Sequence, residues 1–485
     1  MAVIVRHGSE FSNGGNRFRF IGVNIRGLCH FGGGDILPRS SSAMIAENLT
    51  AAAAMGVKVI RFYAGNKYQS AVTNVARLGS LLDALDAKGL KGIICFTDQH
   101  PTGFCPAGDE AYYLNQYNGL NVLDDTWYNG GYLTNYAPWV EAAVTAYKAH
   151  NGVFAWELGN ELSCHDDHDA IIAFTADMAA RIKAIDSDHM VTTGFLSCDD
   201  LKIGFSEAQA LYEDDNIDFI TRHIYSGADD LHPMAYAVDD VVWSRVQKPL
   251  VIEEFGWREM YGNRVTNTQA QVTKWFNLGA RGFMQWGYQS QAYNFDDFES
   301  WDQVGMNPYR YSDYTQLRAI YVAKAAELAG GSGALPATIA PSGANAAIDA
   351  VGWAASGVFG LGFGGNKVYQ GFVSETSKWV SGAGLQGGHW VAIDLGATLS
   401  VKGITLKFEG YLRDDVRFNL RGGLIQKAAA MAGPWSTIYT FSNPGRMSYL
   451  HCLFSPAESV RYLRVYVTDT GQDQYARLLA VEVYI

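Results

Sequence analysis

The sequence predicts an α/β protein: a (β/α)8 barrel, or TIM barrel, followed by an all-β sandwich. Three observations predict it. Short apolar runs alternate with amphipathic helical stretches from about residue 20 to about residue 328. Glycine, serine and proline then interrupt the pattern, and beyond residue 339 strand-like alternation dominates. We therefore expect a barrel domain at 1–328, a linker at 329–338 and a β-sandwich domain at 339–485.

Eight apolar runs have the length of strands, and stretches with helical periodicity separate them. Continuous apolar strands joined by helices indicate a parallel sheet, and eight such units in about 300 residues indicate a closed barrel. The runs are 20–25, 57–63, 92–98, 153–160, 190–195, 217–225, 250–255 and 282–288. The helical stretches are 42–55, 71–88, 136–150, 170–185, 234–246, 269–278 and 313–328.

The first residues form a separate element. Residues 3–19 contain Asn13-Gly14, a turn signal between two short strand-like runs. We expect a hairpin here that caps the bottom of the barrel.

Charge and hydropathy exclude several classes of partner. The chain has 37 Lys and Arg against 49 Asp and Glu, a net charge of −12, and the basic residues do not cluster. Nucleic acids and anionic membranes require a basic patch, so we expect neither as a partner. No apolar run approaches the roughly 20 residues of a membrane span, and the start of the chain does not resemble a signal peptide. A secreted protein shown without its signal would look the same.

The most informative residues are two glutamates, each at the point where an apolar run gives way to a loop. Glu161 follows Asn160, and Glu254 precedes Phe255-Gly256. Glycosidic bond cleavage needs two carboxyl groups, one as proton donor and one as nucleophile or base. Either motif is weak alone, but together and in this order they are a strong signal.

Other polar and aromatic residues close further strands of the predicted barrel. In a barrel of this kind, the chemistry lies at the carboxyl ends of the strands. The residues there are Arg61 and Tyr63, Asp98 and His100, Asn160 and Glu161, His223 and Tyr225, Glu254, and Trp286.

On these residues the chain resembles glycoside hydrolase family 5, over roughly residues 15–320. The resemblance implies that Glu161 is the acid/base and Glu254 the nucleophile of a retaining glycosidase that needs no cofactor or metal. It also implies that Asn160 holds the sugar 2-OH and that Arg61 and Tyr225 orient and ionise the nucleophile. The remaining implied substrate-binding residues are His223, which lines the site, Trp286, which forms the floor of the cleaved subsite, and His100, whose sequence context departs from the family pattern.

Each of these residues also has a structural interpretation. Trp286 is compatible with the core, His223 with a satisfied interior histidine, and Arg61 with a structural ion pair. Glu157 lies four residues before Glu161 on the same side of the strand, and we expect it to be a deeper ion-pair partner. Strand alternation places neighbouring residues on opposite faces, so we expect only one glutamate of the pair at 253 and 254 to point inward. The match to the Glu-Phe-Gly motif selects Glu254.

The cysteines and one acidic loop raise the question of metal ions and disulfides. The six cysteines show no CxxC pattern, which disfavours a zinc site. Cys164 and Cys198 follow neighbouring strands, and the sequence leaves a disulfide and two free thiols equally open. The run at 164–169 contains metal-ligand residue types, but its spacing matches no standard site, so we expect a solvated loop.

The substrate is inferred from similarity alone. Residues 154–164 and 248–256 are similar to the strand-four and strand-seven signatures of the family's β-mannanases. The resemblance implies an endo-β-1,4-mannanase that acts on mannan or a related β-glycan, outside the cell and as a monomer. A β-glucan-cleaving enzyme and an exo-acting β-glycosidase remain open. A non-catalytic glycan-binding protein is the alternative of a different class, and the presence of both carboxylates argues against it.

The C-terminal region resembles the discoidin-type sandwich, a fold that also serves as the family 32 carbohydrate-binding modules. The resemblance rests on Trp379, on the run 390–396, on 461–465 and on 481–483. It implies that Trp379 and Trp390 are core residues and that loops at one end bind sugar. A plain structural domain is the alternative.

Overall fold

The computed structural model describes most of the chain, in two compact units. The described residues are 3–25, 28, 42–64, 71–99, 123–164, 167–225, 237–290, 304–336, 339–371, 373–374, 376–382, 386–412, 416–472 and 474–485. Unit 1 comprises Met1–Asp239 and Lys248–Leu335, and unit 2 comprises Asp240–Gln247 and Pro336–Ile485.

Unit 1 contains eight parallel strands, and this confirms the predicted barrel. Their order in the sheet is β8-β7-β6-β5-β4-β11-β10-β9, and two backbone hydrogen bonds join the two end strands. Asp218 N–H donates to Val191 O at 2.8 Å, and His223 N–H donates to Leu196 O at 3.0 Å. The strands are β4 (Phe20–Asn24), β5 (Val59–Tyr63), β6 (Lys91–Cys95), β7 (Val153–Glu157), β8 (Met190–Thr192), β9 (Ile220–Tyr225), β10 (Leu250–Gly256) and β11 (Gly282–Gln285).

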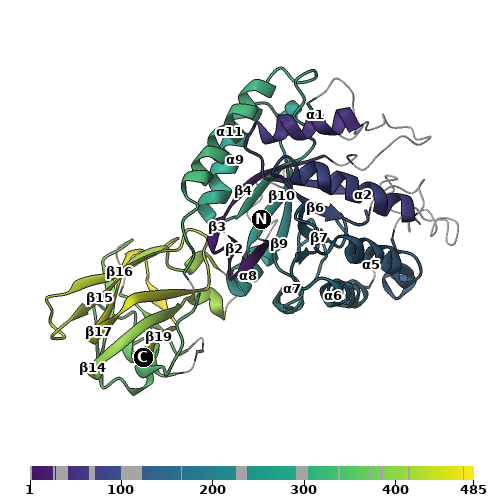
Figure 1. Ribbon diagram of the computed structural model, residues 1–485. Coiled ribbons are helices and arrows are strands. Elements are labelled where there is room, and N and C mark those ends of the chain that lie inside the picture. Colours follow the sequence, from purple (N-terminus) through teal and green to yellow (C-terminus); the bar gives the residue numbers. More distant parts are fainter. Residues whose placement is uncertain are drawn as a thin grey trace. The chain divides into compact units, whose positions relative to one another are not determined.

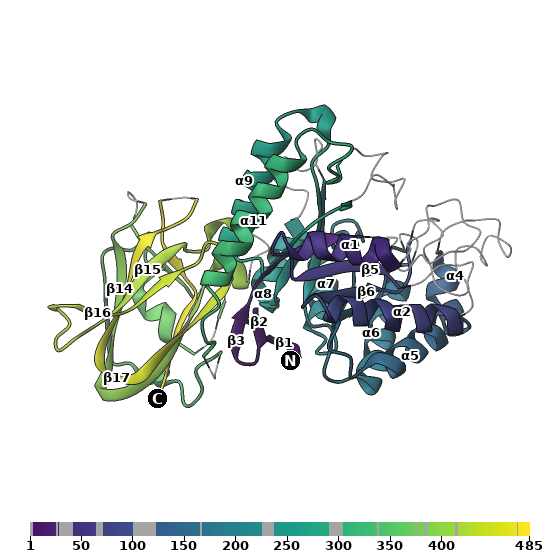
Figure 2. The same ribbon diagram turned by 45° about the horizontal axis from the view of Figure 1, so that its top comes forward.

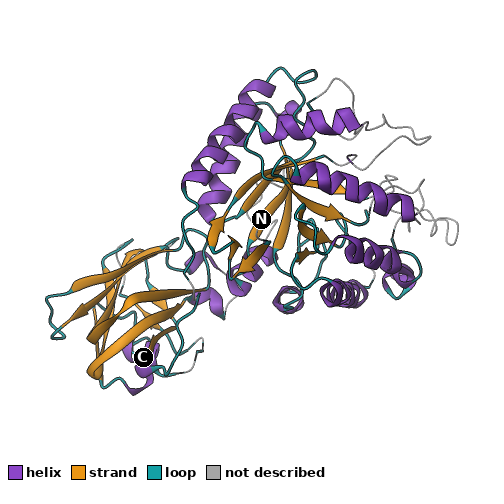
Figure 3. Cartoon of the chain, viewed as in Figure 1, coloured by secondary structure: helices purple, strands orange, loops and turns teal. Residues whose placement is uncertain are grey.

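Helices surround these strands, as Figures 1 and 3 show. They are α1 (Ser42–Ala53), α2 (Ala71–Asp86), α4 (Asp125–Tyr128), α5 (Tyr136–Tyr147), α6 (His168–Ile185), α7 (Phe205–Glu213), α9 (Arg264–Leu278) and α11 (Tyr314–Gly330). A further helix, α8 (Ala237–Val246), belongs mostly to unit 2. The sequence did not predict α4 or α7. Asp167, from the acidic run at 164–169, caps α6 by accepting a hydrogen bond from Ala170 N–H at 3.1 Å. None of the described helices is long and apolar enough to cross a membrane.

The N-terminal segment closes the bottom of the barrel, as predicted, but with three strands instead of a hairpin. β1 (Ile4–His7), β2 (Glu10–Asn13) and β3 (Asn16–Phe18) form an antiparallel sheet. Phe11 is fully buried, and its ring packs edge-on against those of Phe154 and Phe219, at centroid distances of 5.3 and 5.5 Å. The cap therefore shares one apolar core with the strand starts. Figure 2 shows the course of its three strands, β1, β2 and β3.

Several predicted strands extend past the observed strand ends. β7 ends at Glu157 instead of residue 160, and β11 ends at Gln285 instead of residue 288. The apolar pattern continues beyond these ends because the first loop residues remain buried. Asn160, Glu161 and Trp286 therefore lie just beyond their strands and not within them.

Unit 2 is built from antiparallel strands. Six of them form one sheet in the order β12-β14-β17-β15-β16 with β19 paired to β14, and two more form a small sheet. The strands are β12 (Gly352–Ala355), β13 (Trp379–Val380), β14 (His389–Lys407), β15 (Gly422–Ala428), β16 (Ser436–Ser442), β17 (Tyr449–Asp469), β18 (Arg477–Leu478) and β19 (Ala480–Tyr484).

The two tryptophans predicted to lie in the core of unit 2 differ. Trp379 is fully buried, and its indole N–H donates to Gly357 O at 3.1 Å. Trp390 is only partly buried, because its neighbours Val391 and Ile393 take the inward positions of β14, and alternation turns Trp390 to the outer face. The prediction is confirmed for Trp379 and wrong for Trp390.

Candidate functional site

Two consecutive glutamates of β10 both reach the interior of the barrel. A carboxylate oxygen of Glu253 lies 3.7 Å from Nε of Arg61 and 3.3 Å from Nε2 of His223. Glu254 also contacts Arg61 and His223. The prediction that only one could point inward is wrong. The pairing of β10 with β9 shifts register between Ile252 and Glu254, and such an irregularity locally resets strand alternation.

Arg61, near the end of β5, is the cationic centre of the cluster. Nε and Nη2 donate to the two carboxylate oxygens of Glu157, each at 2.7 Å. Nη1 donates to Glu254, and Nη2 donates to Asn160 Oδ1 at 2.8 Å. Burial lowers the pKa of Arg61, but the charges of Glu157, Glu253 and Glu254 outweigh burial and raise it well above its usual value. Arg61 is therefore both a structural ion-pair member and a direct partner of Glu254, and Glu157 is the predicted deeper ion-pair partner.

Glu161 reaches the cluster from the loop after β7. Its backbone has a φ of +50°, an uncommon conformation for a residue other than glycine, and its N–H donates to Gly194 O. Gly194 also has a positive φ, and a Cβ there would lie 2.3 Å from a carboxylate oxygen of Glu157. The side chain of Glu161 is 16% exposed, compared with 3% for Glu254. Among these carboxylates, Glu161 is the most accessible to a ligand.

Asn160 is held in place by two neighbours. Its Oδ1 accepts from Arg61, and its Nδ2 donates to Asp98 Oδ1 at 3.0 Å. The residue is 5% exposed. One side-chain amide N–H remains for a further acceptor, since an amide nitrogen carries two donors.

His223 and Tyr225 lie two residues apart on β9 and face the same side of the sheet. His223 Nδ1 lies 2.8 Å from Glu161 Oε1 and 3.5 Å from Glu254 Oε2. The Tyr225 hydroxyl donates to Glu254 Oε2. Burial lowers the pKa of His223, but the charges of Glu254 and Glu161 and its hydrogen bonds to Glu161 and Glu253 raise it to about 10.

The electrostatic state of Glu254 follows from these contacts. Burial raises its pKa above the ordinary value, while the charges of His223 and Arg61 act in the opposite direction. The charge of Glu161 raises it further, and the hydrogen bond from Tyr225 lowers it. Three donors thus favour the ionised form of a carboxyl group that burial alone would keep protonated.

The carboxylates of Glu161 and Glu254 are close together. One ligand atom from each of Glu161, His223 and Glu254 can be chosen so that all three lie within 4.8 Å of one another. Three such atoms could also hold a metal ion. However, each is already engaged by its neighbours in hydrogen bonds, and the Arg61 guanidinium lies against Glu254. Hydrogen bonds within an acid–base cluster therefore explain why Glu161, His223 and Glu254 lie together, without a metal ion.

The other predicted binding residues have different outcomes. Trp286 is 5% exposed and packs in a buried cluster with Tyr63, Cys95 and Val304, against which Tyr225 also packs. His100 lies outside the described residues.

Asn24, at the end of β4, also belongs to the cluster and was not among the predicted site residues. Its Oδ1 accepts from Arg61 Nη1 at 3.1 Å, and its Nδ2 donates to the backbone carbonyl of Glu253 at 2.8 Å. The signal was available, because Asn24 is an amide at the end of an otherwise apolar run. Asp98 was noted at a strand end, but its contact with Asn160 was not foreseen.

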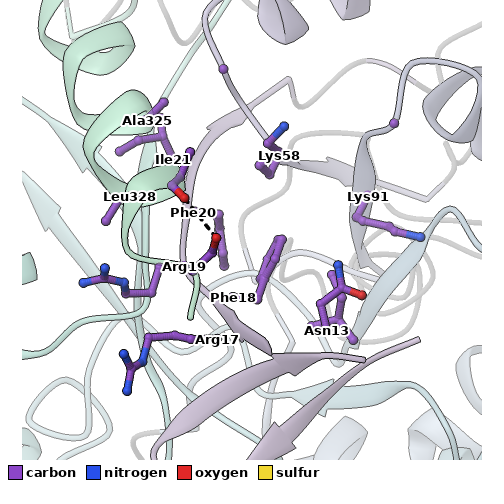
Figure 4. Close-up of a pocket in the computed structure, with 15 residues that line it drawn as sticks. Asn13, Arg17, Phe18, Arg19, Phe20, Ile21, Lys58, Lys91, Ala325 and Leu328 are labelled. Atoms are coloured by element: carbon purple, nitrogen blue, oxygen red, sulfur yellow. Dashed lines mark hydrogen bonds between the residues drawn. The ribbon is translucent and has the colours of Figure 1, made fainter. Parts of the chain in front are cut away.

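A cavity of about 340 Å³ lies at the opposite end of the barrel (Figure 4). It is lined by the cap and by strand starts, including Phe18, Phe20, Lys58 and Lys91. In Figure 4 the two lysine side chains point in different directions. Because barrel chemistry lies at the other ends of the strands, this cavity is not the candidate site.

The structure describes four cysteines, Cys95, Cys164, Cys198 and Cys452, and all four are buried thiols outside any disulfide. The disulfide between Cys164 and Cys198, which the sequence left open, is not formed.

Comparisons with known proteins identify relatives of part of the chain. The model of the family described as "GH family 5 beta-mannosidase-like" matches residues 135–280. Mannan endo-1,4-beta-mannosidase A of Hypocrea jecorina is 26% identical over 275 residues, which cover 50% of this chain and 56% of that protein. Mannan endo-1,4-beta-mannosidase F of Aspergillus clavatus is 28% identical over 232 residues, which cover 44% and 51%. The chain thus spans about half the length of these relatives.

Solved structures show the same fold. An endo-beta-1,4-mannanase from Thermotoga petrophila superposes with a TM-score of 0.52 at 16% identity, and the match covers 96% of this chain and 97% of that one. An endo-1,4-beta-mannanase from Rhizomucor miehei superposes with a TM-score of 0.52 at 16% identity and covers 67% and 100%. At these identities the likeness concerns the fold.

Proposed function

Taking the glycoside hydrolase family 5 mannosidase-like domain of unit 1 as the premise, we propose that this protein is a retaining endo-β-1,4-mannanase. The observation that carries the proposal is the pair Glu161 and Glu254, with carboxylate oxygens within 4.8 Å of each other at the carboxyl ends of the barrel strands. Retaining glycosidases have carboxyl groups about 5–5.5 Å apart, whereas inverting enzymes need about 6.5–9.5 Å to admit a water molecule. The observed separation favours retention.

In this mechanism Glu254 is the nucleophile. Its carboxylate attacks the anomeric carbon, and the bond from that carbon to the leaving oxygen breaks as Glu161 donates its proton to that oxygen. Glu161 then removes a proton from water, whose oxygen attacks the same carbon and releases Glu254. Arg61 and Tyr225 hold one oxygen of Glu254 each, and this leaves the carboxylate ionised and oriented for attack.

The remaining roles follow from position. Asn160, fixed between Arg61 and Asp98, would direct its remaining amide N–H toward the sugar 2-OH. Trp286, packed near Tyr225, would form the floor of the subsite where the bond breaks. His223 would line the site between the two carboxylates, and His100 would contact substrate from the segment after β6.

The activities of two relatives support the substrate proposal. Both relatives compared above are mannan endo-1,4-beta-mannosidases. The second candidate substrate is a β-glucan. The test below also distinguishes cleavage within the polysaccharide chain from cleavage at its end.

A direct test is incubation of the full chain with mannan, glucomannan, cellulose and xylan, with reducing sugar and product length as readouts. We expect release from mannan and glucomannan, and loss of at least about 10³-fold in kcat for Glu161→Gln and Glu254→Gln. Faster cleavage of cellulose than of mannan would indicate a β-glucan hydrolase instead of a mannanase. If wild type cleaves none of the polymers but binds one, the chain is a glycan-binding protein, and full activity in either variant would reject the site.

For unit 2 we propose a discoidin-type carbohydrate-binding module in a secreted protein. Such a module would keep the barrel close to a polymer and raise the local substrate concentration. The test is retention of the full-length Glu161→Gln variant on insoluble mannan. Retention equal to that of a chain truncated after residue 335 would show that unit 2 contributes nothing to binding.

A further inference from the structure

We propose that Glu253 is a positioning residue that acts on Glu161 through His223, as a buried proton relay Glu253–His223–Glu161. This inference rests on the proposed function, because it assigns a task to the residue next to the nucleophile. The mechanism described above uses Glu161 and Glu254 and assigns no role to Glu253.

The geometry of the three residues carries the proposal. His223 presents Nδ1 to Glu161 Oε1 at 2.8 Å and Nε2 to Glu253 Oε2 at 3.3 Å. The imidazole thus joins a partly exposed carboxyl group to a fully buried one. The register shift in β10 makes this possible, since regular alternation would direct Glu253 away from His223.

Glu253 has no structural partner that fully explains its burial. Its Oε2 faces His223 and lies 3.7 Å from Arg61 Nε, but that nitrogen already donates to Glu157 at 2.7 Å. Its Oε1 is buried and makes no hydrogen bond within the described part of the chain. An ionised carboxylate in that position would be costly, so the side chain is suited to hold a proton.

Titratable groups on four strands and one helix surround the relay. Arg61 on β5, Glu157 on β7 and Glu254 on β10 face Glu253 or His223, and the Tyr225 hydroxyl on β9 faces Glu254. Tyr212 of α7 lies within electrostatic range of Glu253. Burial first, and then the charge of Glu157, raise the pKa of Glu253 to about 7. The cluster therefore holds a proton that exchanges near neutral pH.

One proton moves in each half of the reaction. Before cleavage Glu253 and Nε2 of His223 share this proton, while the Nδ1–H of His223 donates to protonated Glu161. When Glu161 gives its own proton to the leaving oxygen, the Glu253 proton transfers to Nε2. The resulting imidazolium then stabilises the Glu161 carboxylate. When Glu161 takes a proton from water, the relay proton returns to Glu253, so no proton is gained or lost.

The test is Glu253→Gln in the full chain. Glutamine cannot supply this proton and lacks the carboxylate charge that stabilises the imidazolium, so the Glu161 carboxylate loses part of its cationic partner. We expect the basic limb of kcat/KM to move upward by about one pH unit. Simple removal of a negative charge would move it downward, because the remaining carboxyl groups would ionise more easily. A downward or absent shift would therefore overturn the relay.

Two further variants separate the relay from loss of stability. Glu157→Gln removes a buried carboxylate that pairs with Arg61 without a direct contact to His223, and it should not move the basic limb upward. Glu253→Asp retains a carboxyl group and should partly restore the wild-type profile. A loss of Tm without a shift in either pH limb would indicate a merely structural role.

The titration of His223 can be measured without substrate, so this test does not depend on whether the protein cleaves a polysaccharide. The His223 imidazole can be followed by ¹⁵N NMR and assigned with His223→Gln. In wild type we expect it to retain its second proton above pH 8, and in Glu253→Gln we expect its pKa to fall by at least about one unit. An unchanged His223 titration would reject the relay even if no polymer is cleaved.

Discussion

Glu161 and Glu254 bring a pair of carboxylate oxygens within 4.8 Å of each other, although 93 residues separate them in the chain. This distance predicts the stereochemistry of the reaction. We expect retention at the anomeric carbon, because there is no room for water between the sugar and Glu254. Proton NMR of the first product formed from a mannan oligosaccharide measures the anomer directly. The α-anomer as first product would contradict this prediction.

Arg61→Lys should disable the site and loosen the barrel. Lysine keeps the charge but loses the bidentate contact with Glu157, and it cannot reach Glu254 and Asn160 at the same time. We expect a loss of about 3 kcal/mol in the free energy of unfolding and at least about 10²-fold in kcat. Chemical denaturation and initial rates measure the two effects. Arg6→Lys is the matched control, because the partly exposed Arg6 makes only long ion pairs, with Asp215 at 3.5 Å and Asp218 at 3.6 Å, and lysine keeps its charge, so neither quantity should change measurably.

His223 should make the stability of the barrel depend on alkaline pH. Its pKa is raised from 6.5 to about 10 in the folded state. A raised histidine pKa means that the folded state binds the proton more tightly, so its stabilising contribution is complete below about pH 6.5 and is lost as pH rises toward 10. We expect the Tm of wild type to fall over this window and that of His223→Gln to fall less. Parallel curves for the two proteins would show that His223 is not the cause.

Glu253 should also make stability fall as pH rises, over a second and lower pH range. Its folded pKa of about 7 exceeds the ordinary 4.5, so the unfolded state loses this proton first and stability declines between about pH 4.5 and 7. Glu253→Gln removes the ionisable group and should flatten this part of the curve. Thermal unfolding from pH 4.5 to 7 checks this, and a slope equal to that of wild type would speak against it.

The two tryptophans of unit 2 should differ in their effect on stability. Trp379→Ala removes a fully buried ring and should cost about 3–5 kcal/mol. Trp390→Ala removes a partly buried ring from the outer face of β14 and should cost clearly less. Hydrogen exchange of β14 and β17 in the full chain reports on unit 2. Equal protection in the two variants would mean that both rings contribute alike.

Four of the six cysteines should be unreactive in the folded protein. Cys95, Cys164, Cys198 and Cys452 are buried and form no disulfide, and burial raises the pKa of Cys95, Cys198 and Cys452, which suppresses the reactive thiolate. We expect iodoacetamide to modify these four only after denaturation, as mass spectrometry of peptides would show. Modification of any of the four in the folded protein would contradict this prediction.

Part of the site was visible in the sequence because the periodicity of a strand depends on local residues. Continuous apolar runs identified all eight barrel strands, and strand ends located Arg61, Asn160, His223 and Glu254. The ends themselves were placed up to three residues too late, since burial of the first loop residues imitates a strand. The three-stranded cap, α4 and α7 were missed because their patterns are short.

The barrel, the two glutamates and the ion-pair role of Glu157 can be predicted from the sequence, because these depend on alternation and on the polar residues that close each strand. The position of Glu253 beside Glu254 inside the barrel cannot be predicted in this way. That outcome depends on the register shift between β9 and β10, a property of strand pairing that no pattern within one strand encodes. For the same reason, the cluster of Arg61, Glu253 and His223 emerges only when three distant strands are brought into contact.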